Sequence, residues 1–282
     1  LPAGWYPATE AETREMLTQW QLSCGSAVND GVACIVPHAG WFFSGRLAFS
    51  TISHLKRDAE TVVVVGGHLA PHENIKAYTE EEFETPLGNL VLDSELFEAI
   101  SQIVDPEIDR RSDNTVEIQL PIVRYLFPHA RVCCFRAAPS TVAEKLGKAI
   151  YRAAETVKRN VVVVGSTDLT HYGPNYGFMP HGSGRKAYEW VRDVNDRRII
   201  DAFLSCDTDA VLSCASKDQS ACSAGGAVAA MEFGRLVLGC GDKQQATGSI
   251  PKAVLVGYLN SHEIYAEESF VGYAGIVYVP KK

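Results

Sequence analysis

NVVVVGSTDLTHYG, residues 160–173, is the stretch of sequence that decides the fold. Its four consecutive valines predict a strand that is covered on both faces, as in the middle of a parallel sheet. Gly165 ends the apolar run, and Asp168 and His171 follow within one short loop. Ligands of open α/β sheets bind beyond the carboxyl ends of the strands. We therefore interpret this carboxylate and this imidazole as candidate site residues.

Two other apolar runs end in the same way. Residues 31–36 (GVACIV) are followed by Pro37 and His38, and residues 61–67 (TVVVVGG) are followed by His68. If the three strands are neighbours that point the same way, their histidines converge at one edge of the sheet. This convergence is the central structural prediction from the sequence.

The rest of the chain alternates helical and strand patterns. We expect further strands at residues 89–92, 131–136, 252–260 and 272–279, and helices at residues 9–20, 44–55, 93–104, 113–126, 143–158, 183–204, 208–216 and 220–238. Thr9 and Glu12 form a capping box, and Pro121 predicts a kink or a restart of its helix. Gly225 and Gly226 permit tight packing of the last helix. The absence of a composition break predicts one domain, residues 1–282, with a three-layer α/β/α sandwich around a mostly parallel or mixed sheet.

Composition excludes some classes of function. Lys and Arg number 26 against 34 Asp and Glu, and this net charge of -8 argues against nucleic acid as the main partner. No apolar run approaches the roughly 20 residues that cross a bilayer, so we expect no membrane partner. No signal-peptide pattern is visible, and the eight cysteines show no CxxC spacing. We therefore expect reduced thiols and a cytoplasmic location.

The strand-end histidines suggest a metal site. Two imidazoles and one anionic ligand, with coordination positions left open, are typical of non-haem Fe(II) enzymes. His38 and His68 are the candidate imidazoles, and the third ligand is either Asp168 or a thiolate. Cys222 is attractive because it lies at the predicted start of a helix, where the dipole and the free N–H groups favour a thiolate. A single histidine in such a loop is more often a hydrogen-bonded loop residue, but three of them favour the ligand hypothesis.

His171 and Asp168 form the candidate acid–base pair. Imidazole titrates near neutral pH, and a nearby carboxylate can fix its tautomer. The alternative is that Asp168 caps a helix that begins near Leu169. A similar ambiguity affects Asn114 and Glu117, which are three residues apart and could share either a pocket or a solvated helix face.

Six short motifs occur in a recognisable order. They are AGWYP at residues 3–7, PHAGW at 37–41, TPLG at 85–88, EIQLP at 117–121, STDLTHY at 166–172 and VGYA at 271–274. Together they resemble the Memo family, the mediator of ErbB2-driven cell motility and its microbial relatives. The resemblance covers nearly the whole chain.

The resemblance implies a fold similar to that of class III extradiol dioxygenases of the LigB type. It implies that His38, His68 and Cys222 are metal ligands, and that Asp168 and His171 are the catalytic pair of the family motif SSD-x-x-H. Family members are associated with iron or copper in a redox role, which makes Fe(II) the first expectation, copper the second and zinc the third. The animal member is also linked to binding a phosphotyrosine peptide.

The sequence departs from the family pattern at several positions. Asp113-Asn114 stands where the family often has Glu-His, which removes one imidazole from the pocket, and Phe43 replaces a common Tyr. Residues 66–68 read GGH in place of Gly-Pro-x-His, and Ser223 follows Cys222 in place of Gly. These changes keep the expected metal ligands and affect the substrate.

Three functional hypotheses follow. The leading one is a metal-dependent oxidoreductase, dioxygenase-like, that uses Fe(II) and O₂ on a small molecule. The second is a binding module that holds a phosphopeptide or a partner protein in the same pocket; a basic lining would favour it, with Arg46, Arg110, Arg111 and Arg185 as candidates. The third is a metal-dependent hydrolase, in which His171 or Asp168 would activate a metal-bound water.

Overall fold

A mixed nine-stranded sheet forms the centre of the molecule, which is described here by a computed structural model for residues 1, 3–25, 29–239 and 252–281. Cys240 lies outside the described residues. The strand order is β10-β11-β1-β8-β2-β7-β3-β6, and β9 pairs with β11. The strands are β1 (Ala33–Val36), β2 (Thr61–Gly66), β3 (Lys76–Ala77), β6 (Glu107–Ile108), β7 (Arg131–Arg136), β8 (Val161–Ser166), β9 (His171–Tyr172), β10 (Lys252–Asn260) and β11 (Phe270–Val279). A separate pair consists of β4 (Glu82–Phe83) and β5 (Leu90–Val91).

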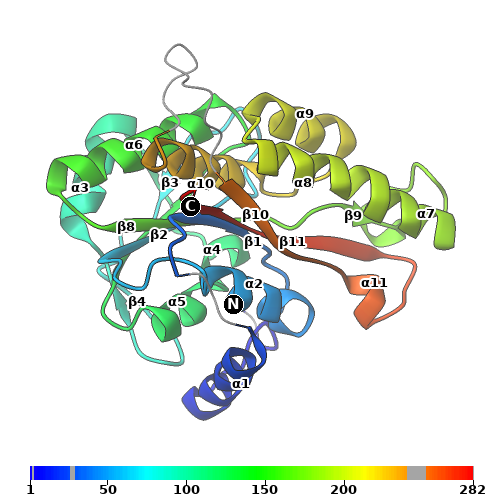
Figure 1. Cartoon of the computed structure of the whole chain (residues 1–282), viewed down its shortest axis with the longest axis horizontal. Coiled ribbons are helices and arrows are strands. Elements are labelled where there is room, and N and C mark those ends of the chain that lie inside the picture. The colour runs from blue at the N-terminus through cyan, green and yellow to red at the C-terminus, as the bar shows by residue number, and fades with distance from the viewer. Residues whose placement is uncertain (2, 26–28, 240–251, 282) are drawn as a thin grey trace.

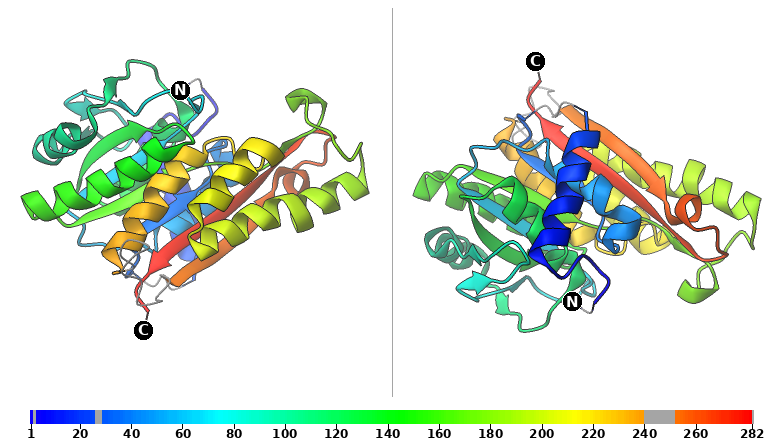
Figure 2. Two further views of the ribbon diagram at one scale, coloured as in Figure 1. Left: turned by 90° about the horizontal axis from the view of Figure 1, so that it is seen from above. Right: turned by 90° about the horizontal axis from the view of Figure 1, so that it is seen from below.

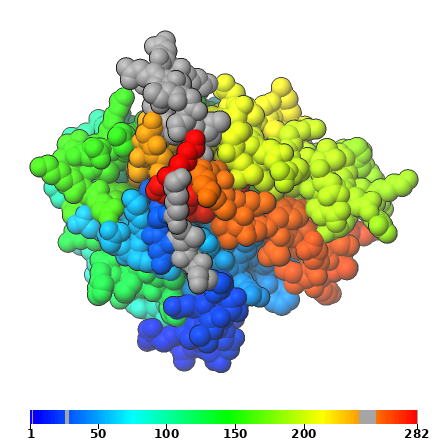
Figure 3. Space-filling view, in the orientation of Figure 1, coloured from blue at the N-terminus to red at the C-terminus, as the bar shows by residue number. Residues whose placement is uncertain are grey.

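The three strands that contain the apolar runs, β1, β2 and β8, are neighbours in the sheet. β8 lies between β1 and β2 and is parallel to both, with Ile35 opposite Gly165 and Val65 opposite the same glycine. Their carboxyl ends therefore lie at one edge of the sheet, as the sequence predicts. The edge strand β10 lies on the surface and forms the orange band of Figure 3.

Helices cover both faces of the sheet. They are α1 (Glu10–Ser23), α2 (Arg46–Ile52), α3 (Ser94–Val104), α4 (Asn114–Glu117), α5 (Leu120–Leu126), α6 (Thr141–Val157), α7 (Arg185–Trp190), α8 (Asp196–Ser205), α9 (Thr208–Asp218), α10 (Ala224–Val237) and α11 (Ser261–Ile264), with π-helical turns η1 (Trp41–Gly45) and η3 (Val191–Asn195) and a 3₁₀ turn η2 (Pro174–Tyr176). Figure 1 shows the sheet between the two helical layers, and Figure 2 shows α6, α8, α9 and α10 over one face and α1 and α2 over the other. The predicted α/β/α sandwich is confirmed.

Side chains of the central strands alternate between two cores. Val163 packs into the core beneath α6 and α10, whereas Val162 and Val164 pack into the core beneath α2 and α5. Because both faces of β8 are covered, the strand needs no polar alternation. The close approach of α10 also follows from the sequence, since a Cβ atom on Gly226 would lie 2.4 Å from the Val65 carbonyl oxygen.

Local chemistry explains the starts of two helices. Thr9 is the N-cap of α1, and Glu12 N donates to its side-chain oxygen at 3.3 Å. The pattern at residues 113–126 divides into α4 and α5, and Pro121 lies in the first turn of α5, where its missing N–H is harmless.

The structure differs from the predicted elements in several places. The helix expected at residues 183–204 contains the π turn η3 between α7 and α8. Residues 68–82, for which the sequence predicts neither a helix nor a strand, contain β3, a two-residue strand too short to give a periodic signal. The helix expected at residues 220–238 begins at Ala224 as α10, so Cys222 precedes it. Among the described residues, no helix has the length and apolar character needed to cross a bilayer.

Candidate metal centre

Three side chains from separate parts of the chain meet at the carboxyl edge of the sheet. His38, His68 and Cys222 each offer one ligand atom, and these atoms lie within 4.8 Å of one another. His38 follows β1, His68 follows β2, and Cys222 precedes α10. The residue types alone allow either Asp168 or a thiolate as the third ligand. Cys222 is the one whose ligand atom lies in the cluster with those of both histidines.

His38 is held as a neutral imidazole. Its side chain is buried, and burial, followed by repulsion from His68 and His171, lowers the pKa of His38 well below its ordinary value. Its Nδ1 lies 3.0 Å from Ser166 Oγ, and its Nε2 lies 3.2 Å from Cys222 Sγ. The tautomer in which Nδ1 donates to Ser166 Oγ would leave the Nε2 lone pair facing the sulfur, which is the requirement for a metal ligand.

Asp168 fixes the turn that carries His38. Its Oδ1 accepts a hydrogen bond from His38 N at 2.7 Å, and Ala39 N–H also donates to this carboxylate. Burial raises the pKa of Asp168 against the lowering effect of these contacts. No helix begins at Leu169, because the chain enters β9 at His171, so the alternative role of Asp168 as a helix cap does not apply.

His68 is the most exposed of the three candidate ligands. Its backbone is left-handed, with φ +56°, and its Nδ1 lies 3.6 Å from Asp113 Oδ2. Burial raises the pKa of Asp113, but the contacts with His68 and Thr115 outweigh it and hold this pKa well below its usual range. At 3.6 Å the contact with His68 is longer than a hydrogen bond, so the Asp113 carboxylate acts on the ring through its charge.

Cys222 is not the activated thiol that its place before a helix predicts. Burial, and then the charge of Asp168, raises the pKa of the Cys222 thiol. The helix-dipole argument is wrong for the metal-free protein because desolvation of the sulfur outweighs the dipole at this position. A bound cation would reverse that balance, since a coordinating thiol is deprotonated.

The donor set fits a transition-metal ion. Two imidazole nitrogens and one sulfur are borderline and soft donors, which suit iron, copper and zinc and do not suit Mg²⁺ or Ca²⁺. Glycine makes the approach of the segments possible: a Cβ atom on Gly67 would lie 2.1 Å from Ser223 Oγ and 2.9 Å from Ser223 Cα. Gly67, which precedes His68, and Ser223, which follows Cys222, are therefore in direct contact.

His171 lies in the same pocket, with a different hydrogen-bond partner from the one expected. Its Nδ1 lies 3.1 Å from the Leu169 carbonyl oxygen. A carbonyl can only accept, so Nδ1 carries the proton of the neutral ring and Nε2 keeps a lone pair. The Leu169 carbonyl therefore fixes the tautomer, in place of the Asp168 carboxylate that the sequence suggests.

A cavity of about 310 Å³ adjoins the candidate ligands. Its lining includes His38, His68, Asn114, Asp168 and His171, the aromatic residues Trp5, Phe43, Tyr176, Tyr265 and Tyr273, and the acidic Glu267. Asn114 donates from Nδ2 to the His38 carbonyl oxygen at 3.3 Å, so the residue that replaces a family imidazole supports the His38 turn.

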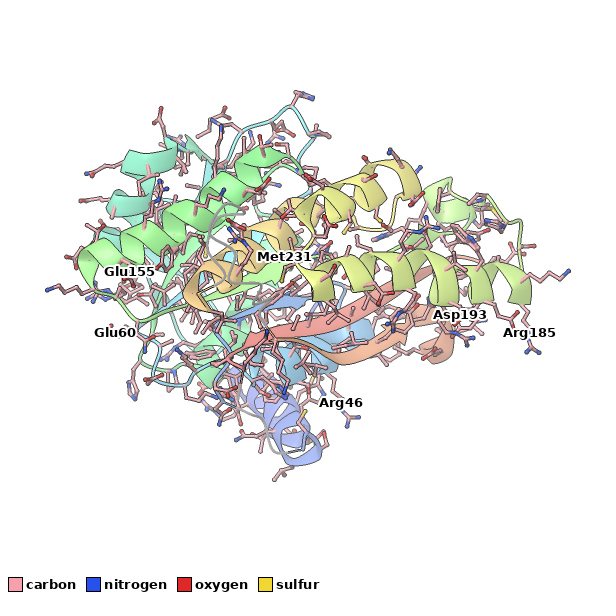
Figure 4. The ribbon with its side chains drawn as sticks, turned by 45° about the horizontal axis from the view of Figure 1, so that its top comes forward. Arg46, Glu60, Glu155, Arg185, Asp193 and Met231 are labelled. Atoms are coloured by element: carbon pink, nitrogen blue, oxygen red, sulfur yellow. The ribbon has the colours of Figure 1, made fainter. Side chains whose placement is uncertain are left out.

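The four arginines considered for a basic lining lie elsewhere. Arg110 and Arg111 line a larger cavity of about 700 Å³, whose lining also includes Asp113. Arg46 and Arg185 project from separate parts of the surface (Figure 4). Among the described residues that line the 310 Å³ cavity, none is Lys or Arg.

Sequence reasoning missed two groups that support the site. Arg136 lies at the end of β7 and donates to Asp113 Oδ2 at 2.8 Å; its position at a strand end was the available signal. Asp196 accepts from Thr170 N at 3.1 Å and from Tyr258 OH at 2.8 Å, and it thereby holds the loop between Asp168 and His171. Nothing in the sequence marks Asp196, because it lies inside a predicted helix.

Comparison with known proteins gives one consistent family. The family model described as "Memo-like protein" matches residues 2–277. Three MEMO1 family proteins are similar over nearly the full length. The relative from Thermococcus onnurineus is 33% identical, with 99% of this chain and 97% of the relative aligned. The relative from Pyrococcus abyssi is 33% identical (97% and 96%), and that from Archaeoglobus fulgidus is 30% identical (99% and 97%).

A solved structure has a similar fold. The crystal structure of the uncharacterized protein JW3007 from Escherichia coli K12 matches with a TM-score of 0.55 and 10% sequence identity. The match covers 87% of this chain and 98% of the other chain. At this identity the similarity concerns the fold alone.

Proposed function

We propose that this chain, which belongs to the Memo-like protein family, binds one transition-metal ion through His38, His68 and Cys222 and acts as a non-haem oxidoreductase. The observation that carries the proposal is the meeting of two imidazoles and one thiol within 4.8 Å at the carboxyl edge of the sheet. Three protein ligands leave coordination positions open, as a metal that acts on a substrate requires.

The donor set guides the choice of metal. Fe(II) is our first candidate, copper is the second and zinc is the third, because imidazole suits all three and the chemistry we propose needs an ion that changes oxidation state. When bound, such an ion would supply electron exchange with the substrate and with O₂. A sulfur donor adds more electron density than a carboxylate, so the reaction need not be ring cleavage.

The residues around the metal ligands have separate roles in this proposal. His171 would accept a proton at Nε2 from the substrate, since its Nδ1 is committed to Leu169. Asp168 would act through His38, by holding the backbone of that ligand. Tyr176 and Tyr273 would enclose an apolar or aromatic substrate that fits a cavity of about 310 Å³.

The charge of the cavity separates this proposal from a phosphopeptide-binding module. Phosphate recognition relies on arginine or lysine groups. The charged side chains that line this cavity, apart from histidine, are the acidic Asp168 and Glu267. A doubly negative phosphotyrosine would meet these carboxylates with no Lys or Arg side chain to pair with it, so we favour an uncharged or cationic small molecule as the ligand.

Metal analysis of protein purified without added metal is the first test. Iron or copper near one equivalent supports the oxidoreductase, and zinc near one equivalent would favour a hydrolase in which His171 or Asp168 activates water. The second test is anaerobic loading with Fe(II), followed by O₂ consumption with a panel of phenols and thiols. Equal metal uptake by wild type and His38→Ala would remove the proposal.

A further inference from the structure

We propose that Asp113 is the positioning residue of His68; the inference rests on the proposed metal function. His68 needs such a residue more than the other two candidate ligands do. His38 is enclosed by the core, whereas about a third of the His68 side chain is exposed, 35%. A side chain that packing does not hold depends on specific polar contacts to keep its ring in place.

The first contact is a clamp on the backbone before His68. Gly67 N–H donates to Thr115 Oγ1 at 3.1 Å, and the Gly67 carbonyl oxygen accepts from Arg136 Nη1 at 3.2 Å. The N–H group and the carbonyl group of Gly67 are therefore both held by hydrogen bonds, one on each side of the residue. This clamp holds the chain where it turns into the left-handed conformation of His68.

One carboxylate orients both arms of the clamp. The Thr115 hydroxyl donates to Asp113 Oδ1, and Thr115 N donates to the same oxygen at 3.0 Å. Arg136 Nη1 donates to Asp113 Oδ2 at 2.8 Å. Because the Thr115 hydroxyl has a single proton and gives it to Asp113, its lone pairs are left to receive the Gly67 N–H.

The second contact reaches the ring of His68. Its Nδ1 is 3.6 Å from Asp113 Oδ2, so a small rotation of the ring would form an N–H···O hydrogen bond. A carboxylate beside Nδ1 favours the tautomer that carries its proton there and leaves Nε2 to bind an ion. Carboxylate partners of this kind typically change metal affinity by about 10- to 100-fold when they are removed.

Asp109 offers a matched control. Its Oδ2 accepts from Arg136 Nε at 2.7 Å, so it shares the arginine with Asp113. Among the described contacts, Asp109 touches neither Gly67 nor the ring of His68. Asp109→Asn and Asp113→Asn each remove one charge beside Arg136, but only the second variant also alters the acceptor of Thr115 and removes the charge beside the ring of His68.

The experiment measures two properties of wild type, Asp113→Asn and Asp109→Asn. The first is the tautomer of His68 in the metal-free protein, from ¹⁵N–¹H spectra assigned with His68→Gln. The second is the affinity for Co²⁺ as a spectroscopic probe. We expect wild type and Asp109→Asn to show the Nδ1–H tautomer of His68, and Asp113→Asn to show mixed tautomers. The Co²⁺ affinity should be lowered about 10- to 100-fold in Asp113→Asn and should stay within about threefold of wild type in Asp109→Asn.

The outcomes separate the inference from the proposed function. Equal losses of Co²⁺ affinity in the two variants, or a His68 tautomer that is unchanged in Asp113→Asn, would overturn the inference. If wild type binds no Co²⁺, the proposed function fails, and the tautomers still decide whether Asp113 positions the ring. If Asp113→Asn does not fold, Thr115→Val removes one arm of the clamp, and unchanged Co²⁺ affinity in that variant would contradict the inference.

Discussion

Cys222 Sγ lies 3.2 Å from Nε2 of His38, although 184 residues separate the two in the sequence. The contact exists because β1 lies inside the sheet and α10 packs across it, with its first turn beside the carboxyl ends of the strands. A partly buried thiol beside a buried neutral imidazole leaves both groups uncharged. Both are thereby ready to bind a cation once the thiol loses its proton.

Metal binding should therefore release about one proton. Burial raises the pKa of the Cys222 thiol and lowers that of His38, so at neutral pH the sulfur carries a proton and His38 does not. The affinity for a divalent ion should rise about tenfold for each pH unit between about pH 6 and pH 8. Calorimetry in buffers of different ionisation enthalpy counts the protons. Release that is unchanged in Cys222→Ser would mean that the sulfur is not the source.

Stability should depend on pH through Asp196. Burial raises the pKa of Asp196 to about 7, against about 3.9 in an unfolded chain. Between these values the folded state keeps a proton that the unfolded state has lost, so the free energy of unfolding falls as pH rises. The free energy of unfolding should fall by about 2–3 kcal/mol from about pH 5 to about pH 7.5, and this contribution of Asp196 should be constant above about pH 8.

Asp196→Asn should remove this part of the pH dependence. The amide keeps the shape of the side chain and an acceptor for Thr170, and it has no proton to lose. Urea unfolding at the two pH values measures the difference between wild type and the variant. Parallel profiles for the two proteins would show that Asp196 is not the titrating group.

Gly67→Ala should damage both stability and the metal site. The added Cβ atom would lie 2.9 Å from Ser223 Cα, and backbone must move to relieve that contact. We expect a loss of about 1–3 kcal/mol in the free energy of unfolding and weaker metal binding, because the residues next to His68 and Cys222 are forced apart. Gly25→Ala is the control, since no atom lies within 4 Å of its added Cβ. An unchanged metal affinity in Gly67→Ala would count against the observed packing.

Asp168→Asn should weaken the His38 turn. The substitution keeps one acceptor oxygen, but an NH₂ group replaces the other, so the hydrogen bonds from His38 N and Ala39 N lose the negative charge that strengthens them. Hydrogen bonds to charged groups contribute about 1.5–3 kcal/mol, so we expect a loss of this size together with lower metal affinity. Asp201→Asn, which removes only an exposed ion pair with Arg197, should change stability by less than about 1 kcal/mol. Similar effects of the two variants would refute this role of Asp168.

The fold could be predicted because its signals are local. Four consecutive valines at residues 161–164 require cover on both faces, and two further apolar runs end in histidine. The rule that ligands bind beyond the carboxyl ends of parallel strands then places His38, His68 and His171 together. The π turn before Asp196 gave no signal, because one extra residue barely changes the helical period.

The chemistry of the site could be predicted only in part. The residue types identified Cys222 and Asp168 as candidates, but desolvation of the sulfur depends on packing that the sequence does not display. The partner of His171 is the backbone carbonyl of Leu169, and backbone acceptors carry no sequence signal. Arg136 and Asp113 come from different strands and loops, so their pairing needs the tertiary structure.

A Co²⁺ titration followed by absorption spectroscopy tests the central claim most directly, because a thiolate ligand gives an intense near-ultraviolet charge-transfer band. Wild type and Cys24→Ser, whose cysteine lies at the end of α1, should each bind about one equivalent and show the band. Cys222→Ser should lose the band, and His38→Ala should bind Co²⁺ at least about tenfold more weakly. Absence of the band in wild type, or its persistence in Cys222→Ser, would contradict the account.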